Sequence, residues 1–148
     1  MHQHHLTARI TLWVNRLIGL LLAVLLPTLP LLLDWYCNFR VLTHAEYWAI
    51  AIAFYCSAAV VAVALWNLDR LLRNILALSV FTKDNVLHIR RVQWCCAGVS
   101  LICLPAAFIY LPLSFMVVIM AFLCLVVSVV AQVMAAAVAI REENDLTI

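Results

Sequence analysis

Histidines near the N-terminus and acids near the C-terminus are the residues whose types could bind a metal ion. His2, His4 and His5 offer imidazole nitrogens, but no fourth ligand stands near them in the sequence, so we expect a disordered polar start. The acids between positions 142 and 145 lack the glycine and the oxygen spacing of a calcium loop. The sequence therefore predicts no metal site at either end.

Catalysis or proton-coupled transport inside a membrane would need an acid, a histidine or an activated nucleophile in the middle of an apolar stretch. The polar residues within the apolar stretches of this chain are mainly neutral ones: Thr28, Ser57, Asn67, Gln93, Ser100, Ser114, Ser128 and Gln132. Asn15 and Arg16 interrupt the first stretch only near its start. Serine and threonine in a helix can bond to a backbone carbonyl of the preceding turn. We therefore expect a protein that is not an enzyme and that has no catalytic residues and no cofactor.

Composition indicates the class of chain that holds these residues. Of the 148 residues, 68% are hydrophobic and 11% are charged, against about half and about a quarter in soluble domains. The mean hydropathy is +1.12, and the net charge of +2 is too small to indicate direct binding to nucleic acid. A soluble domain and a disordered tail are excluded, and the lipid bilayer is the expected surrounding.

Four apolar stretches have the length of about 20 residues that a helix needs to cross a bilayer. They are residues 12–33, 47–68, 92–111 and 114–140. Only helices or closed barrels satisfy their backbone in lipid, and the stretches lack the alternation of barrel strands. The sequence thus predicts an all-α integral membrane protein, a single four-transmembrane-helix bundle over 1–148. We expect the first stretch to be an uncleaved helix, because no small-residue cleavage pattern follows it.

The positive charges predict how these spans are oriented. Of the nine Lys and Arg, all except Arg40 lie at the start of the first span, between the second and third spans, or after the fourth. Lys and Arg in short loops stay on the cytoplasmic side. Both termini are therefore expected in the cytoplasm, with Trp13, Trp66 and Trp94 at the inner interface.

The segment between the second and third spans is predicted to form a cytoplasmic helical hairpin, an extension over residues 69–91. Leucine and isoleucine recur at helical spacing beyond the second span, at Leu68, Leu71, Leu72, Ile75 and Leu76. The other face of this helix holds Asp69, Arg70, Arg73 and Asn74. Thr82 can cap the next helix, with a hydrophobic staple between Phe81 and Val86.

The tail over 141–148 has a charge opposite to that of the hairpin. Glu142, Glu143 and Asp145 lie where the helix dipole disfavours anions. We therefore expect the tail to fold back, with its acids against the hairpin and its last apolar side chains, Leu146 and Ile148, in the hairpin's groove. The cations available to the tail are Arg70, Arg73, Arg90 and Arg91. The alternative is a solvated tail with the basic segment resting on anionic lipid heads.

Small and polar residues within the spans predict where helices pack. Ser128 and Gln132 share one face of the fourth span, with Ala131 and Ala135 in a stripe close to it, and Ser57 has a similar setting in the second span. Such spacing lets helices approach closely. Packing within the bundle is the preferred interpretation, and a homo-oligomer interface is the alternative.

The prolines belong to the outer halves of the spans or to the outer turn, at Pro27, Pro30, Pro105 and Pro112. Each removes a backbone hydrogen bond and bends or ends its helix. We favour prolines that simply collect near span ends. The alternative is a set of splayed helices around an outward-facing cavity for a lipid, peptide or amphiphile.

Two segments, 81–91 and 141–148, resemble the hallmarks of a family of small bacterial four-span membrane proteins known as domain of unknown function 2975. The resemblance covers nearly the whole chain. It implies a bacterial cytoplasmic membrane and, often, a neighbouring gene for a small helix-turn-helix regulator, and it implies no known activity. The positions that match the family's motifs are Phe81, Asn85, Arg90, Glu143, Asn144, Asp145 and Leu146.

Two functions are compatible with these features. We expect a regulatory or sensory membrane protein whose hairpin and acidic tail bind a cytoplasmic protein, such as a small helix-turn-helix regulator. The alternative is a subunit of a small oligomeric pore or amphiphile transporter, assembled through the small-residue stripes.

Overall fold

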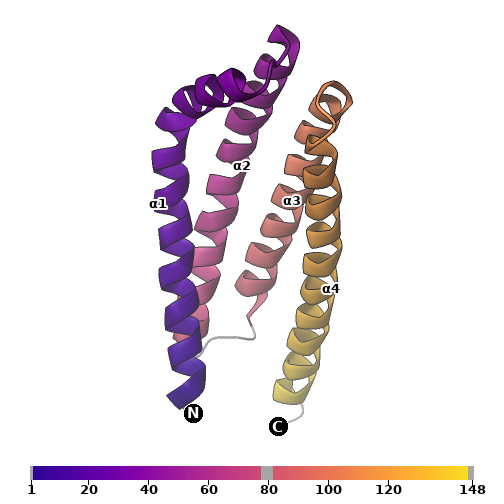
Figure 1. Ribbon diagram of the computed structural model, residues 1–148. Coiled ribbons are helices and arrows are strands. Elements are labelled where there is room, and N and C mark those ends of the chain that lie inside the picture. Colours follow the sequence, from indigo (N-terminus) through magenta and orange to yellow (C-terminus); the bar gives the residue numbers. More distant parts are fainter. Residues whose placement is uncertain (1, 78–81, 147–148) are drawn as a thin grey trace.

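A computed structural model describes the backbone of residues 2–77 and 82–146, and the side chains over 9–77 and 82–144. It contains four helices: α1 (His2–Phe39), α2 (His44–Leu76), α3 (Lys83–Ile109) and α4 (Leu113–Leu146) (Figure 1). The described residues include no strand. All four helices are long and apolar enough to cross a membrane. The prediction of an all-α, multi-pass membrane protein is therefore confirmed.

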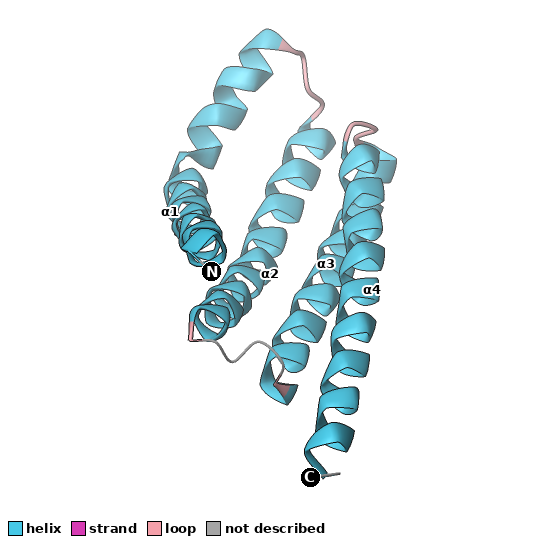
Figure 2. Cartoon of the chain, turned by 90° about the horizontal axis from the view of Figure 1, so that it is seen from below, coloured by secondary structure: helices cyan, strands magenta, loops and turns pink. Residues whose placement is uncertain are grey.

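The helices pack in the order of the chain. α1 contacts α2, α2 contacts α3 and α3 contacts α4, and the described parts of α1 and α4 do not meet. Viewed from below, they form an open, curved row (Figure 2). A cluster of Leu71, Ile89 and Ala131 joins α2, α3 and α4. Wide apolar faces are left uncovered, and the most apolar stretch of α4 contains no buried residue.

The second span continues as a helix beyond Leu68, as its leucine stripe predicts. α2 runs unbroken to Leu76, with Leu71 and Leu72 buried. α3 begins at Lys83 directly after Thr82, whose backbone is extended and whose carbonyl accepts from the Asn85 amide. Phe81, the other half of the expected staple, lies outside the described residues.

The predicted hairpin extension is not found. The start of α1 and the end of α4 reach past the end of α2 and the start of α3, so these two helix ends are flanked by other helices and do not project from them (Figure 1). Two further expectations are wrong because α1 and α4 are longer than the sequence predicted. Residues 2–8 are helical where a disordered start was expected, and α4 continues to Leu146, so the acidic segment extends the helix instead of folding back.

Because of these long ends, one end of the molecule gathers the start of α1, the end of α2, the start of α3 and the end of α4 (Figure 1). We call it the basic end, since it carries every Lys and Arg except Arg40: Arg9, Arg16, Arg70, Arg73, Lys83, Arg90, Arg91 and Arg141. The connections 40–43 and 110–112 form the opposite end.

α1 bends in the half that holds its two prolines (Figure 1). Pro30 has no N–H, so the Leu26 carbonyl, four residues earlier, loses its partner within the helix. Tyr55 Oη of α2 donates to that carbonyl at 3.1 Å. Beyond the bend, Tyr36 Oη lies 2.9 Å from the Oη of Tyr110 at the end of α3. Hydrogen bonds from two other parts of the chain therefore hold the bent end in place.

Candidate functional site at the basic end

A fully buried asparagine lies at the start of α3. The Asn85 side chain is 0% exposed, and its Oδ1 accepts a hydrogen bond of 2.8 Å from Asn74 Nδ2 on α2. Burying an amide costs free energy unless it is hydrogen-bonded. Asn74, which the sequence placed on the polar face of its helix, therefore belongs to the contact between α2 and α3.

A second polar pair, Asn67 of α2 and His88 of α3, lies further from the basic end. Asn67 Nδ2 donates to the Val63 carbonyl at 2.8 Å, and Asn67 Oδ1 lies 2.9 Å from His88 Nδ1. Because an amide oxygen only accepts, the His88 Nδ1 carries the proton in this arrangement. We call Asn67, Asn74, Asn85 and His88 the polar seam. It fixes the register between α2 and α3.

Polar contacts also attach α1 to α2 near this end. Asn15 is buried, and its Nδ2 donates to the Leu65 carbonyl at 3.2 Å. Asp69 of α2 pairs with Arg16 of α1 at 3.4 Å and with Arg73 of its own helix at 2.7 Å. The Asp69 side chain is 20% exposed, so this network is partly shielded from solvent.

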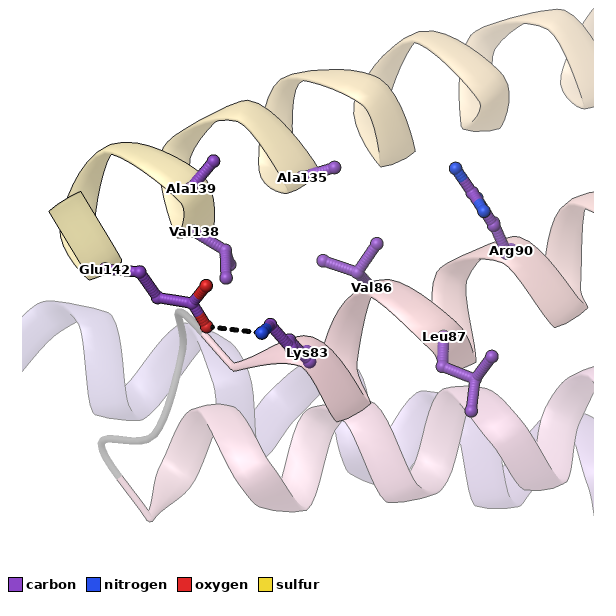
Figure 3. A pocket seen from close by; sticks show the side chains of 8 residues that line it. All are labelled: Lys83, Val86, Leu87, Arg90, Ala135, Val138, Ala139 and Glu142. Atoms are coloured by element: carbon purple, nitrogen blue, oxygen red, sulfur yellow. Dashed lines mark ion pairs between the residues drawn. The ribbon is translucent and has the colours of Figure 1, made fainter.

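An ion pair and a pocket lie between α3 and α4. Lys83 Nζ is 2.9 Å from Glu142 Oε1, beside a cavity of about 300 Å³ (Figure 3). Its walls include Lys83, Val86 and Arg90 of α3 and Ala135, Ala139 and Glu142 of α4. The acidic segment thus does meet the start of α3, but through the side of a continuous helix.

The four arginines expected to hold the acidic tail have other settings. Arg70 lies over the Trp66 ring, 5.8 Å from its centroid. Arg73 pairs with Asp69, and Arg90 and Arg91 are exposed on α3. Glu142 pairs with Lys83, which was not among the expected partners.

The remaining hallmark residues lie at the end of α4. Glu143 and Asn144 are exposed. Asp145 and Leu146 belong to the last turn of the helix, and their side chains lie outside the described residues.

The residues expected to pack helices have two different settings. Ala131 is 3% exposed in the cluster that joins three helices, and Ala135 lines the pocket. Ser57 Oγ of α2 lies 3.5 Å from a cysteine Sγ of α3. Gln132, by contrast, is exposed and its Nε2 donates to Ser128 Oγ of the same helix at 3.4 Å. This last pair therefore bonds along α4 rather than between helices.

The match to a known family covers this whole arrangement. A family described as a protein of unknown function (DUF2975) matches residues 15–148. The chain belongs to the DUF2975 family. No curated protein and no solved structure matches it. The matched region of this DUF2975 protein begins at Asn15, a buried polar residue of α1, and includes the polar seam and the pocket.

The opposite end of the DUF2975 protein has its own polar features. The Arg40 guanidinium interacts with Tyr36 and Tyr110, and its hydrogen bond to Tyr36 is the main cause of an Arg40 pKa above the ordinary value. Between the end of α1 and the start of α2 lies a pocket of about 330 Å³, bordered by Cys37, His44 and Trp48 among others. Among the described residues, no three His, Cys, Asp or Glu side chains gather closely enough to hold a metal ion.

Proposed function

We propose that this DUF2975 protein is a non-enzymatic regulator in a bacterial cytoplasmic membrane, and that its basic end binds a cytoplasmic protein such as a small helix-turn-helix regulator. The binding surface would comprise the end of α2, the start of α3 and the end of α4. A signal received at the opposite end or in the bilayer would alter this surface.

The polar seam is the observation that carries the proposal. Apolar residues of similar size would join two helices at least as well, so stability alone gives little reason to bury Asn85 and Asn67. Paired polar groups instead favour a single register, because any slip leaves a buried group unbonded. A surface held in one register is suited to recognising a protein partner.

The distribution of charge supports the cytoplasmic side for this end. Every Lys and Arg except Arg40 belongs to the basic end. Positive residues next to spans are retained in the cytoplasm. Both termini and the α2–α3 connection would then face soluble cytoplasmic partners.

The proposal can be tested by affinity purification from native membranes. The full chain is compared with a chain that ends at Arg141, which removes the acidic segment, and with a Glu46→Gln variant. Glu46 lies at the opposite end, where its Oε2 accepts from the Thr43 amide. We expect one soluble protein to co-purify with the full chain and the Glu46→Gln variant only. Equal recovery with the truncated chain would contradict the proposal.

The alternative function is a subunit of an oligomeric pore or amphiphile transporter. Two observations favour it: the described parts of α1 and α4 do not meet, and α4 exposes a long apolar face. Such a face could pack against a second copy. A defined oligomer in mild detergent together with flux across reconstituted liposomes would establish it, whereas a monomeric particle without flux would exclude it.

A further inference from the structure

The pocket between α3 and α4 combines apolar walls with positive charge. Val86 and the two alanines of α4 are part of its walls, and the small alanine side chains leave the space of about 300 Å³. The Lys83–Glu142 ion pair borders the side nearest the helix ends. Arg90 rises from α3 at the other side, toward α4 (Figure 3).

Arg90 gives the pocket a positive charge that no carboxylate among the described side chains (9–77 and 82–144) compensates. Lys83, the other cation of the pocket, is neutralised by Glu142. Arg90 is exposed, and no carboxylate in the described part of the chain lies within ion-pair distance of it. A guanidinium in this setting is suited to binding a phosphate through two parallel hydrogen bonds.

The position of Arg90 along the helix corresponds to the surface of a membrane. The charge-free stretch of α3 begins two residues later, at Val92. The bond between Asn67 and His88 places Arg90 near the level of Trp66, whose side chain is 67% exposed. Exposed tryptophans gather at the height of lipid headgroups. The phosphates of the surrounding lipids would therefore lie at the height of this pocket.

We propose that this pocket binds an anionic phospholipid, with Arg90 contacting the phosphodiester. Side chains of a helix tilt toward its N-terminus, so the Arg90 guanidinium leans from the membrane side into the pocket. The apolar walls then receive the glycerol backbone and the first methylene groups. A free phosphate ion would use the charge but leave those walls uncovered, which is why a lipid is the better occupant.

The test measures binding of phosphatidylglycerol to the purified full chain in a zwitterionic detergent, by native mass spectrometry. Arg91→Gln is the matched control for Arg90→Gln, because Arg91 is equally an exposed arginine of α3 but does not line the pocket. Arg90→Gln should weaken binding about fivefold, the effect of one cation near a charged membrane surface. Arg91→Gln should leave binding unchanged.

A second variant tests whether binding depends on the space in the pocket rather than on the charge of Arg90. Ala135→Leu fills the pocket without altering any charge, and it should also weaken phosphatidylglycerol binding while Arg90 remains. Phosphatidylcholine should bind the wild-type chain more weakly than phosphatidylglycerol. Equal losses in Arg90→Gln and Arg91→Gln would overturn the proposal in favour of diffuse attraction. The proposal would also be overturned if inorganic phosphate, at the same concentration as the lipid, displaced phosphatidylglycerol. Equal binding of phosphatidylglycerol and phosphatidylcholine would overturn it as well.

Discussion

The Asn74 amide of α2 lies 2.8 Å from the Asn85 side-chain oxygen of α3, at a point where Asn85 is completely buried. The contact joins two helices directly beside the connection that links them. Its polar character makes it sensitive to single changes, because a buried group that loses its partner is not rescued by water.

Replacing Asn85 with alanine should lower the free energy of unfolding by about 1–3 kcal/mol, since the Asn74 hydrogen bond loses its acceptor in a buried site. The measurement is unfolding in mixed detergent micelles, followed by circular dichroism. Asn38→Ala is the control: Asn38 is exposed on α1, and its replacement should change the free energy by less than about 0.5 kcal/mol. Similar losses of unfolding free energy in the two variants would show that the Asn74–Asn85 hydrogen bond does not stabilise the fold.

The bond between Tyr55 and the Leu26 carbonyl predicts a coupling to Pro30. Tyr55→Phe should lower the free energy of unfolding by about 1 kcal/mol, because the carbonyl that Pro30 leaves free loses its partner. In a Pro30→Ala background, residue 30 regains its N–H, so Tyr55→Phe should cost clearly less. A double-mutant cycle in detergent micelles measures the difference. An unchanged cost would refute the role assigned to Tyr55.

Two acids of the basic end should differ in their contribution to stability. Asp69 is 20% exposed and pairs with two arginines, whereas the Glu142 side chain is 52% exposed and pairs with a lysine that is 76% exposed. We expect Asp69→Asn to lower the free energy of unfolding by about 1 kcal/mol or more, and Glu142→Gln by less than about 1 kcal/mol. Thermal unfolding of both variants at low and high salt provides the comparison, and the reverse order would contradict the structure.

The orientation can be examined with single cysteines placed in a chain whose own cysteines are replaced by alanine. Val41 and Ala77 are exposed at the opposite end and at the basic end. In intact cells, a membrane-impermeant maleimide should label Val41→Cys, and it should label Ala77→Cys only after the membrane is permeabilised. Labelling in the reverse order would place the basic end outside the cytoplasm.

The helices themselves were predictable because their signals are local. The leucine stripe from Leu68 to Leu76 predicts the buried face of α2, and Thr82 predicts the start of α3. Apolar length alone identifies four spans. These patterns depend on the chain near each residue, so one sequence is enough to interpret them.

The partners of the polar side chains were not predictable, because they depend on the register between helices. Asn74 was placed on a polar face, yet it bonds to Asn85. One signal could have revealed the polar seam: Asn67 and Asn74 are seven positions apart on one helix, and Asn85 and His88 are three apart on the next. The Lys83–Glu142 pair was missed because the acidic segment was expected to leave the helix.

The most direct measurement of the central claim is crosslinking in native membranes from a photoreactive residue at Ala77, compared with one at Val41. Ala77 follows α2 at the basic end, and Val41 lies exposed at the opposite end. If the basic end binds a cytoplasmic regulator, one soluble protein should be captured from Ala77 and not from Val41. Capture of only lipid or of a second copy of the chain from Ala77 would contradict a regulatory surface at this end.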